Sequence, residues 1–141
     1  MFSTICKVIM VLLEKENVLS YDELCNRVGL TSSTIDNVMI DMVMFGLAKR
    51  ESEKIYLLVD SLDRSIDLLW DFFKRHILYI ESQKELKNGF TYSDFRTLFV
   101  KTYNDKLLND KTRNTYSSKI FDWFIKLNFF TEKDGGYFIK A

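Results

Sequence analysis

Residues 111–119, KTRNTYSSK, gather side chain types that bind nucleic acids. The stretch carries three positive charges and no acid, and hydroxyl groups fill most of its other positions. Arginine can pair with guanine through two hydrogen bonds, asparagine can do so with adenine, and lysine neutralises phosphate. The stretch that follows, IFDWFIKLNFF, is among the most apolar in the chain. A helix with this sequence would anchor its second half in a core and present its first half to a partner.

Other residue groups fit catalysis or metal binding poorly. Residues 51–54, ESEK, match the acid-x-acid-Lys pattern of metal-dependent nucleases, but they fall in a predicted hairpin turn and not beside a second acid in a mixed sheet. His76 is the only histidine and has no cysteine or second histidine to complete a metal site. We therefore expect no enzyme activity, no metal and no cofactor. Four aspartates recur at helical spacing and are expected to start and solvate a helix: Asp60, Asp63, Asp67 and Asp71.

The composition predicts a folded chain without a global preference for polyanions. Of the 141 residues, 47% are hydrophobic and 15% aromatic, enough to fill a core, and the net charge is zero. Residues 1–60 hold six basic and nine acidic side chains, whereas residues 61–141 hold fourteen and eleven, so the second half is the better candidate for contact with a polyanion. Cys6 and Cys25 fit neither a zinc site nor a disulfide framework, and no apolar run is long enough for a membrane span. These features predict a reduced cytoplasmic protein.

An internal repeat organises the chain. In both halves a hydroxyl residue precedes a tyrosine, and an acid lies three positions after the hydroxyl residue: Ser20-Tyr21 with Glu23, and Thr91-Tyr92 with Asp94. This pattern predicts a helix start in which the hydroxyl group accepts a hydrogen bond from a free backbone N–H.

The ends of the two halves are also alike. Each contains a residue that tolerates the left-handed conformation, Gly46 or Asn128, and then two short apolar strands around a polar turn at residues 51–54 or 133–136. The first half is thus predicted as three helices and a hairpin, with Ser32 or Ser33 capping the third helix. The second half is predicted with the same order, and its three helices are expected at residues 62–84, 92–103 and 112–127.

This order resembles the winged helix-turn-helix family, here twice in tandem. Residues 18–50, VLSYDELCNRVGLTSSTIDNVMIDMVMFGLAKR, carry the resemblance best, and the second unit departs by about nine extra residues between its second and third helices. The expected fold is mainly α with small β-hairpins (α+β). The resemblance implies two winged-helix units, residues 1–60 and 61–141, with the long helix 62–84 joining them.

The resemblance also implies double-stranded DNA binding, as in a transcription regulator or another recognition module. The third helix of the second unit would enter the major groove, and the two wings would contact phosphates. The residues expected at DNA are Lys111, Thr112, Arg113, Asn114, Thr115, Ser117, Ser118, Lys119 and Lys133 in the second unit, and Ser32, Ser33, Thr34, Asn37, Lys49 and Arg50 in the first.

Two alternatives stay open. Tandem winged helices also resemble those of protein-interaction scaffolds, and the neutral net charge and acidic first unit favour a protein partner. The wide apolar surface of helix 62–84 fits packing between the two units or against a second copy in a homodimer, as in helix-turn-helix dimers that read two half-sites.

Overall fold

The structure is a computed structural model and describes residues 2–103 and 109–140. The expected fold class is confirmed, because the described residues form mainly helices with small antiparallel strands. The chain divides into two compact units, Met1–Phe72 and Phe73–Ala141. The boundary therefore lies inside a helix, after Phe72, whereas the sequence placed it after residue 60.

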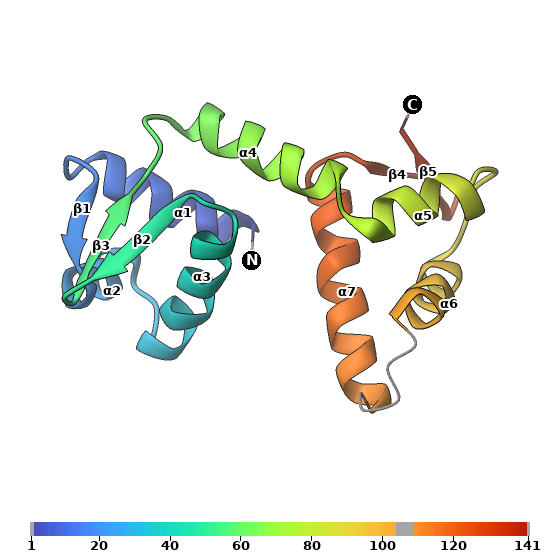
Figure 1. Cartoon of the computed structure of the whole chain (residues 1–141), viewed down its shortest axis with the longest axis horizontal. Coiled ribbons are helices and arrows are strands. Elements are labelled where there is room, and N and C mark those ends of the chain that lie inside the picture. Colours follow the sequence, from blue (N-terminus) through green and yellow to red (C-terminus); the bar gives the residue numbers. More distant parts are fainter. Residues whose placement is uncertain (1, 104–108, 141) are drawn as a thin grey trace. The chain divides into compact units, whose positions relative to one another are not determined.

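In unit 1, three complete helices and the first eleven residues of α4 (Leu62–Lys74) accompany a small sheet (Figure 1). Its strands are arranged in the order β1-β3-β2, and both pairings are antiparallel. Strand β1 was not predicted, because its pairing with β3 joins residues far apart in the sequence. The elements are α1 (Phe2–Leu13), β1 (Val18–Ser20), α2 (Tyr21–Val28), α3 (Ser32–Met44), β2 (Ala48–Glu51) and β3 (Lys54–Leu57).

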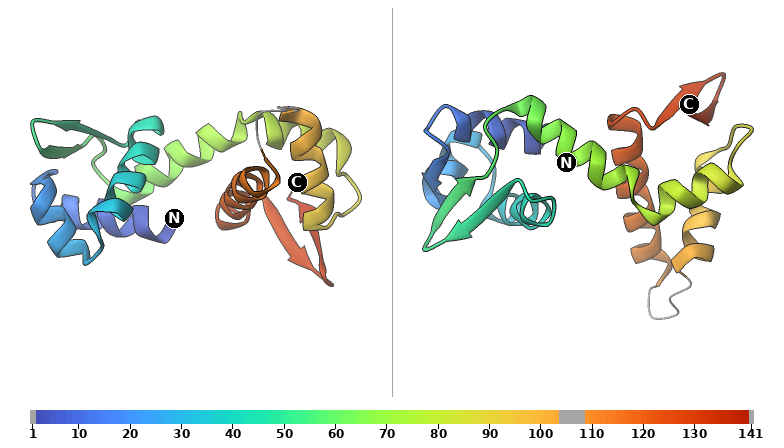
Figure 2. Two further views of the ribbon diagram at one scale, coloured as in Figure 1. Left: turned by 90° about the horizontal axis from the view of Figure 1, so that it is seen from below. Right: turned by 45° about the horizontal axis from the view of Figure 1, so that its top comes forward.

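In unit 2, three helices are followed by a two-stranded hairpin, which extends away from α7 (Figure 2). Phe90 forms an isolated antiparallel bridge with Tyr137, where unit 1 has its third strand. The elements are α5 (Ile77–Glu85), α6 (Tyr92–Tyr103), α7 (Asp110–Lys126), β4 (Phe130–Lys133) and β5 (Gly136–Ile139). The sequence also predicts an irregular segment at residues 104–110, of which residues 104–108 lie outside the described part of the chain.

The prediction of one long helix over residues 62–84 is wrong. The structure has α4 (Leu62–Lys74), then Arg75 and His76, then α5. His76 has extended backbone angles and caps α5, with its Nδ1 accepting a hydrogen bond from Leu78 N at 3.1 Å. A capping side chain in extended conformation starts a new helix, which apolar periodicity alone does not reveal.

The predicted helix starts of the repeat are present. Ser20 Oγ accepts from Glu23 N at 3.2 Å, and Thr91 Oγ1 accepts from Asp94 N at 3.2 Å. In unit 2 the Asp94 carboxylate also accepts from Thr91 N at 2.9 Å, which completes a reciprocal capping box. The cap of α3 is Thr31, not Ser32 or Ser33, because the Thr31 hydroxyl accepts from Thr34 N at 3.3 Å.

The two units share one register from the end of the third helix to the end of the hairpin. Leu47 N donates to Met42 O, and Phe129 N, 82 residues later, donates to Phe124 O. Strands β2 and β3 correspond to β4 and β5 at the same spacing of 82. The capped tyrosines Tyr21 and Tyr92 are only 71 residues apart, so unit 2 has eleven more residues between the start of its second helix and the end of its third. Helices α6 and α7 are each four residues longer than α2 and α3, and the segment between them, 104–109 against 29–31, is three residues longer. The prediction of about nine extra residues between the two helices is therefore wrong, because most of the added length belongs to the helices themselves.

The cores of the two units differ in kind. Unit 1 is filled mainly by aliphatic and methionine side chains, and those that exclude solvent fully include Ile5, Ile9, Leu12, Leu24, Ile35, Met42, Leu47 and Ile55. Unit 2 is filled by aromatic rings, among them Phe95, Phe121, Trp123, Phe124, Phe129 and Phe130. Phe124 is fully buried, with ring centroids of Phe130 at 4.9 Å and Phe129 at 5.9 Å.

Candidate nucleic-acid interface

Helix α7 combines a buried second half with a polar first half. Its N-cap is Asn109, whose side chain accepts a hydrogen bond from Thr112 N at 2.8 Å. Phe121, Trp123 and Phe124 are buried, and Trp123 stacks on Phe73 with a centroid separation of 5.1 Å. These rings hold the helix against the core of unit 2. The packed second half of α7 therefore fixes the position of its first turns, as a binding site on a helix requires.

The residues of α7 that were predicted to contact DNA differ in their exposure to solvent. Thr112 and Arg113 are partly buried. Ser117 is fully buried, so its prediction as a DNA contact is wrong. Five side chains are exposed and form what we call the α7 face: Lys111, Asn114, Thr115, Ser118 and Lys119.

Tyr92 explains why Ser117 turns inward. The Tyr92 hydroxyl lies 3.0 Å from Ser117 Oγ and donates to Asn114 Oδ1 at 3.4 Å, and Ser117 Oγ donates to Asn114 O at 3.2 Å. The tyrosine of the sequence repeat thus ties the start of α6 to α7. A bidentate contact of Asn114 with adenine uses both atoms of the amide, so it requires Asn114 Oδ1 to leave Tyr92.

Arg113 lies against the helix and is not extended from it. Its side chain is 22% exposed, and its Nη1 lies 3.8 Å from Asp110 Oδ1, while the Asp110 side chain is 90% exposed. A contact with guanine requires the guanidinium group to swing away from Asp110. Because Asp110 is almost fully exposed and lies 3.8 Å away, the ion pair with it contributes only about 0–1 kcal/mol.

Three further side chains extend the α7 face. Tyr116 is 49% exposed and can offer a ring and a hydroxyl group. Lys126 is exposed seven residues after Lys119, which is two helical turns further along the same side, and helical spacing alone could have identified it. Lys133, predicted as a wing residue, is exposed at the end of β4. One exposed acid, Asp122, lies between Lys119 and Lys126.

The predicted residues of unit 1 are exposed, but its two wing cations are paired with acids. Ser32, Ser33, Thr34 and Asn37 are all exposed on α3. Lys49 Nζ lies 3.5 Å from Glu51 Oε1 and 5.3 Å from the centre of the Tyr56 ring. Phosphate contact by Lys49 would compete with these interactions.

Arg50 belongs to a cluster with Tyr21 and Asp36. Arg50 Nη1 donates to Asp36 Oδ1 at 3.2 Å, and the guanidinium group lies 4.3 Å from the centre of the Tyr21 ring. The Tyr21 hydroxyl lies 2.8 Å from the same carboxylate oxygen and 2.7 Å from Ser32 O. Burial, followed by the hydrogen bond to Asp36, raises the pKa of Tyr21 to about 12. The cluster joins α2, α3 and β2 and compensates the charge of Asp36.

Charge separates the two units further. Residues 1–72 contain seven basic and twelve acidic side chains, a net charge of −5, and residues 73–141 contain thirteen and eight, a net charge of +5. The neutral chain therefore consists of one acidic and one basic unit.

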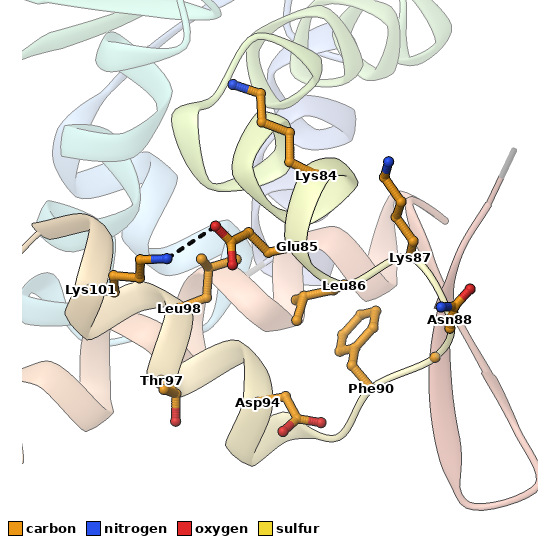
Figure 3. A pocket seen from close by; sticks show the side chains of 11 residues that line it. Lys84, Glu85, Leu86, Lys87, Asn88, Phe90, Asp94, Thr97, Leu98 and Lys101 are labelled. Atoms are coloured by element: carbon orange, nitrogen blue, oxygen red, sulfur yellow. Dashed lines mark hydrogen bonds and ion pairs between the residues drawn. The ribbon is translucent and has the colours of Figure 1, made fainter.

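A pocket of about 510 Å³ lies between the end of α5, the loop after it and α6 (Figure 3). Lys84, Lys87 and Lys101 line it, but Lys101 Nζ lies 3.1 Å from Glu85 Oε1 and Lys84 Nζ lies 3.6 Å from Glu81 Oε1. The acids offset much of the positive charge of this pocket.

The described residues contain neither a metal-binding group of acids, histidines and cysteines nor a helix that could span a membrane. Within residues 2–103 and 109–140, no three His, Cys, Asp or Glu side chains come together in a group that could hold a metal ion. Over the same residues, none of the helices has the length and apolar character needed to cross a bilayer.

The comparisons with known proteins give little. No model of a known protein family matches the chain, and no curated protein matches its sequence. Among solved structures, the chain is similar to the mRNA-binding domain of elongation factor SelB from E. coli, in complex with SECIS RNA, at 9% sequence identity. The match covers 96% of this chain and 98% of that one, but its TM-score is 0.32, and a likeness at that level supports no transfer of function.

Proposed function

We propose that the two units are winged helix-turn-helix modules and that unit 2 binds double-stranded DNA without catalysing a reaction. The α7 face would contact the major groove, and Lys133 of the β4–β5 hairpin would contact the phosphate backbone. The observation that carries the proposal is the first half of α7. After Asp110, the exposed acid that begins the helix, residues 111–121 contain no acid, and their exposed side chains donate or accept hydrogen bonds or carry positive charge.

The net charge of +5 for residues 73–141 supports the same assignment. Positive charge on one unit attracts a polyanion even when the whole chain is neutral, provided that the acidic unit is not forced onto the same partner. Within the α7 face, Lys111 and Lys119 would bind phosphates. Asn114, Thr115 and Ser118 would contact base edges or the backbone.

The test is binding to mixed-sequence duplex DNA over a range of salt concentrations. The double variant K111A/K119A should weaken binding and should lower the slope of log affinity against log salt by about 2, because each lost phosphate contact removes about 0.9. The matched control is K84A/K87A, which makes the same change in net charge on unit 2 away from α7. It should leave the slope nearly unchanged.

Two outcomes would count against the proposal. Equal loss in K111A/K119A and K84A/K87A would mean that only net charge matters and that α7 is not the contact helix. Tighter binding to an RNA hairpin than to the duplex DNA, with the same sensitivity to K111A/K119A, would keep α7 as the contact helix but replace DNA by RNA.

A further inference from the structure

The outward surface of α3 in unit 1 differs in chemistry from the equivalent surface of α7. At the shared spacing of 82, Ile40 corresponds to Asp122 and Met44 to Lys126. All four side chains are exposed. The two helices thus occupy the same place in their units, but one presents charges and the other presents apolar groups.

The apolar groups of α3 form one patch. Ile40 is 67% exposed, Met44 57% and Val43 50%. They lie three and four residues apart, so they occupy adjoining turns on one side of the helix. Single exposed apolar residues are ordinary on protein surfaces, but a contiguous group of large ones commonly marks an interaction site. We call Ile40, Val43 and Met44 the α3 apolar face.

Charge disfavours nucleic acid as the partner of this face. Helix α3 contains no lysine or arginine, and unit 1 carries a net charge of −5. Phosphates would be repelled. The acid on the exposed side of α3 nearest to the patch is Asp36, which is paired with Arg50. At the end of the helix Phe45 packs on Phe72 at a centroid distance of 4.9 Å, and Asp71, the residue before Phe72, is exposed.

The same charge disfavours a second copy of unit 1. Pairing two α3 apolar faces would bring two units of net charge −5 together. A partner with positive charge around its apolar residues would gain both burial and electrostatic attraction. We propose that the α3 apolar face docks an amphipathic helix of a partner protein whose leucine-like side chains are flanked by lysine or arginine. This interface is separate from the α7 face.

The probe for this proposal is a labelled synthetic helical peptide of leucine and lysine, and the comparison peptide has glutamate at every lysine position. The variant I40D/M44K places in unit 1 the two residues that unit 2 has at these positions, and it leaves the net charge unchanged. By fluorescence anisotropy, the wild-type chain should bind the leucine–lysine peptide, and I40D/M44K should bind it about tenfold or more weakly, as expected when central apolar contacts of an interface are lost.

The matched control is L58N, which removes another exposed apolar side chain, 53% exposed, outside α3. L58N should leave peptide binding unchanged, and so should K111A/K119A, which tests the α7 face independently. Circular dichroism should show that I40D/M44K keeps the helical content of the wild type.

Three results would overturn the proposal. One is peptide affinity that is insensitive to I40D/M44K or equally sensitive to L58N. Another is binding of the leucine–glutamate peptide as tight as that of the leucine–lysine peptide. The third is a wild-type dimer in analytical ultracentrifugation that I40D/M44K converts to monomers, since the α3 apolar face would then be occupied by a second copy.

Discussion

Units 1 and 2 have the same succession of helices and the same hairpin register, but the side chains of their cores and of their surfaces differ in chemistry. Unit 1 has an aliphatic core, a net charge of −5 and an apolar outer side on its third helix. Unit 2 has an aromatic core, a net charge of +5 and a polar, cationic outer side on its third helix. One backbone arrangement thus supports two surfaces of different chemistry, so resemblance in fold gives no assignment of function to either unit alone.

The largest expected effect on the free energy of unfolding comes from truncating core side chains. Phe124 and Met42 occupy equivalent positions in the two units, and both are fully buried. Phe124→Ala should destabilise the chain by about 3–5 kcal/mol and Met42→Ala by about 2–5 kcal/mol, because each leaves a cavity. We expect Phe124→Ala to cost more, since six neighbouring rings lose a contact with it: Phe73, His76, Tyr79, Phe95, Phe129 and Phe130.

Urea unfolding followed by circular dichroism measures both variants. Phe138→Ala is the control, because Phe138 is 39% exposed and its loss should cost less than Phe124→Ala. A larger loss of unfolding free energy for Met42→Ala than for Phe124→Ala would contradict the expectation that losing the aromatic ring costs more.

The next effect compares the two tyrosines of the repeat. Tyr21→Phe should destabilise the chain by about 1.5–3 kcal/mol, because the lost hydrogen bond is made to the Asp36 carboxylate. Tyr92→Phe should cost about 0.5–1.5 kcal/mol, because its partners, Ser117 and Asn114, are neutral. Thermal unfolding gives both values, and equal losses would argue against a special role for the carboxylate.

The same tyrosine gives a pH dependence. The pKa of Tyr21 is raised to about 12 in the folded chain, whereas an unfolded tyrosine titrates near 10. The unfolded state therefore loses its proton first, and the stabilisation present below about pH 10 should be lost as the pH rises toward 12. The unfolding free energy of the wild type should fall more steeply over this window than that of Tyr21→Phe. Parallel profiles of unfolding free energy against pH for the two proteins would contradict the assignment of this pH dependence to Tyr21.

The smallest effect concerns the residues that end the third helices. Gly46 has φ +76° and Asn128 has φ +63°. Gly46→Ala should destabilise by about 1 kcal/mol through the backbone alone, since no atom lies within 4 Å of the added Cβ. Asn128→Gly should stabilise by about 0.5 kcal/mol. Differential scanning calorimetry should show shifts of opposite sign, and shifts of the same sign would mean that the Asn128 side chain has a role of its own.

Local signals in the sequence predicted the elements well. Hydroxyl caps, Gly46 and Asn128, and the polar turns are contacts within a few residues, so they can be found without the fold. The tertiary features were missed. Strand β1 exists through its pairing with β3, and the end of α4 depends on His76 adopting an extended conformation. Both arise from residues or backbone states that apolar spacing does not encode.

The candidate site was predicted less completely for the same reason. The polar start of α7 could be located from composition, but the inward turn of Ser117 depends on Tyr92, twenty-five residues earlier in the chain. The pairing of Arg50 with Asp36 likewise joins a strand to a helix. A sequence shows which side chains have a suitable chemical type. Their intramolecular hydrogen bonds and ion pairs, which reduce their availability to a ligand, are seen only in the structure.

The constant spacing of 82 makes residues 42–58 and 124–140 cassettes of equal length. Each cassette can replace the other without adding or removing a residue. Such a chimera changes which side chains pack in the core but keeps the backbone length and the strand register. The additional residues of unit 2 all precede its cassette. An insertion there changes the segment that leads into the third helix and leaves the β4–β5 hairpin unchanged.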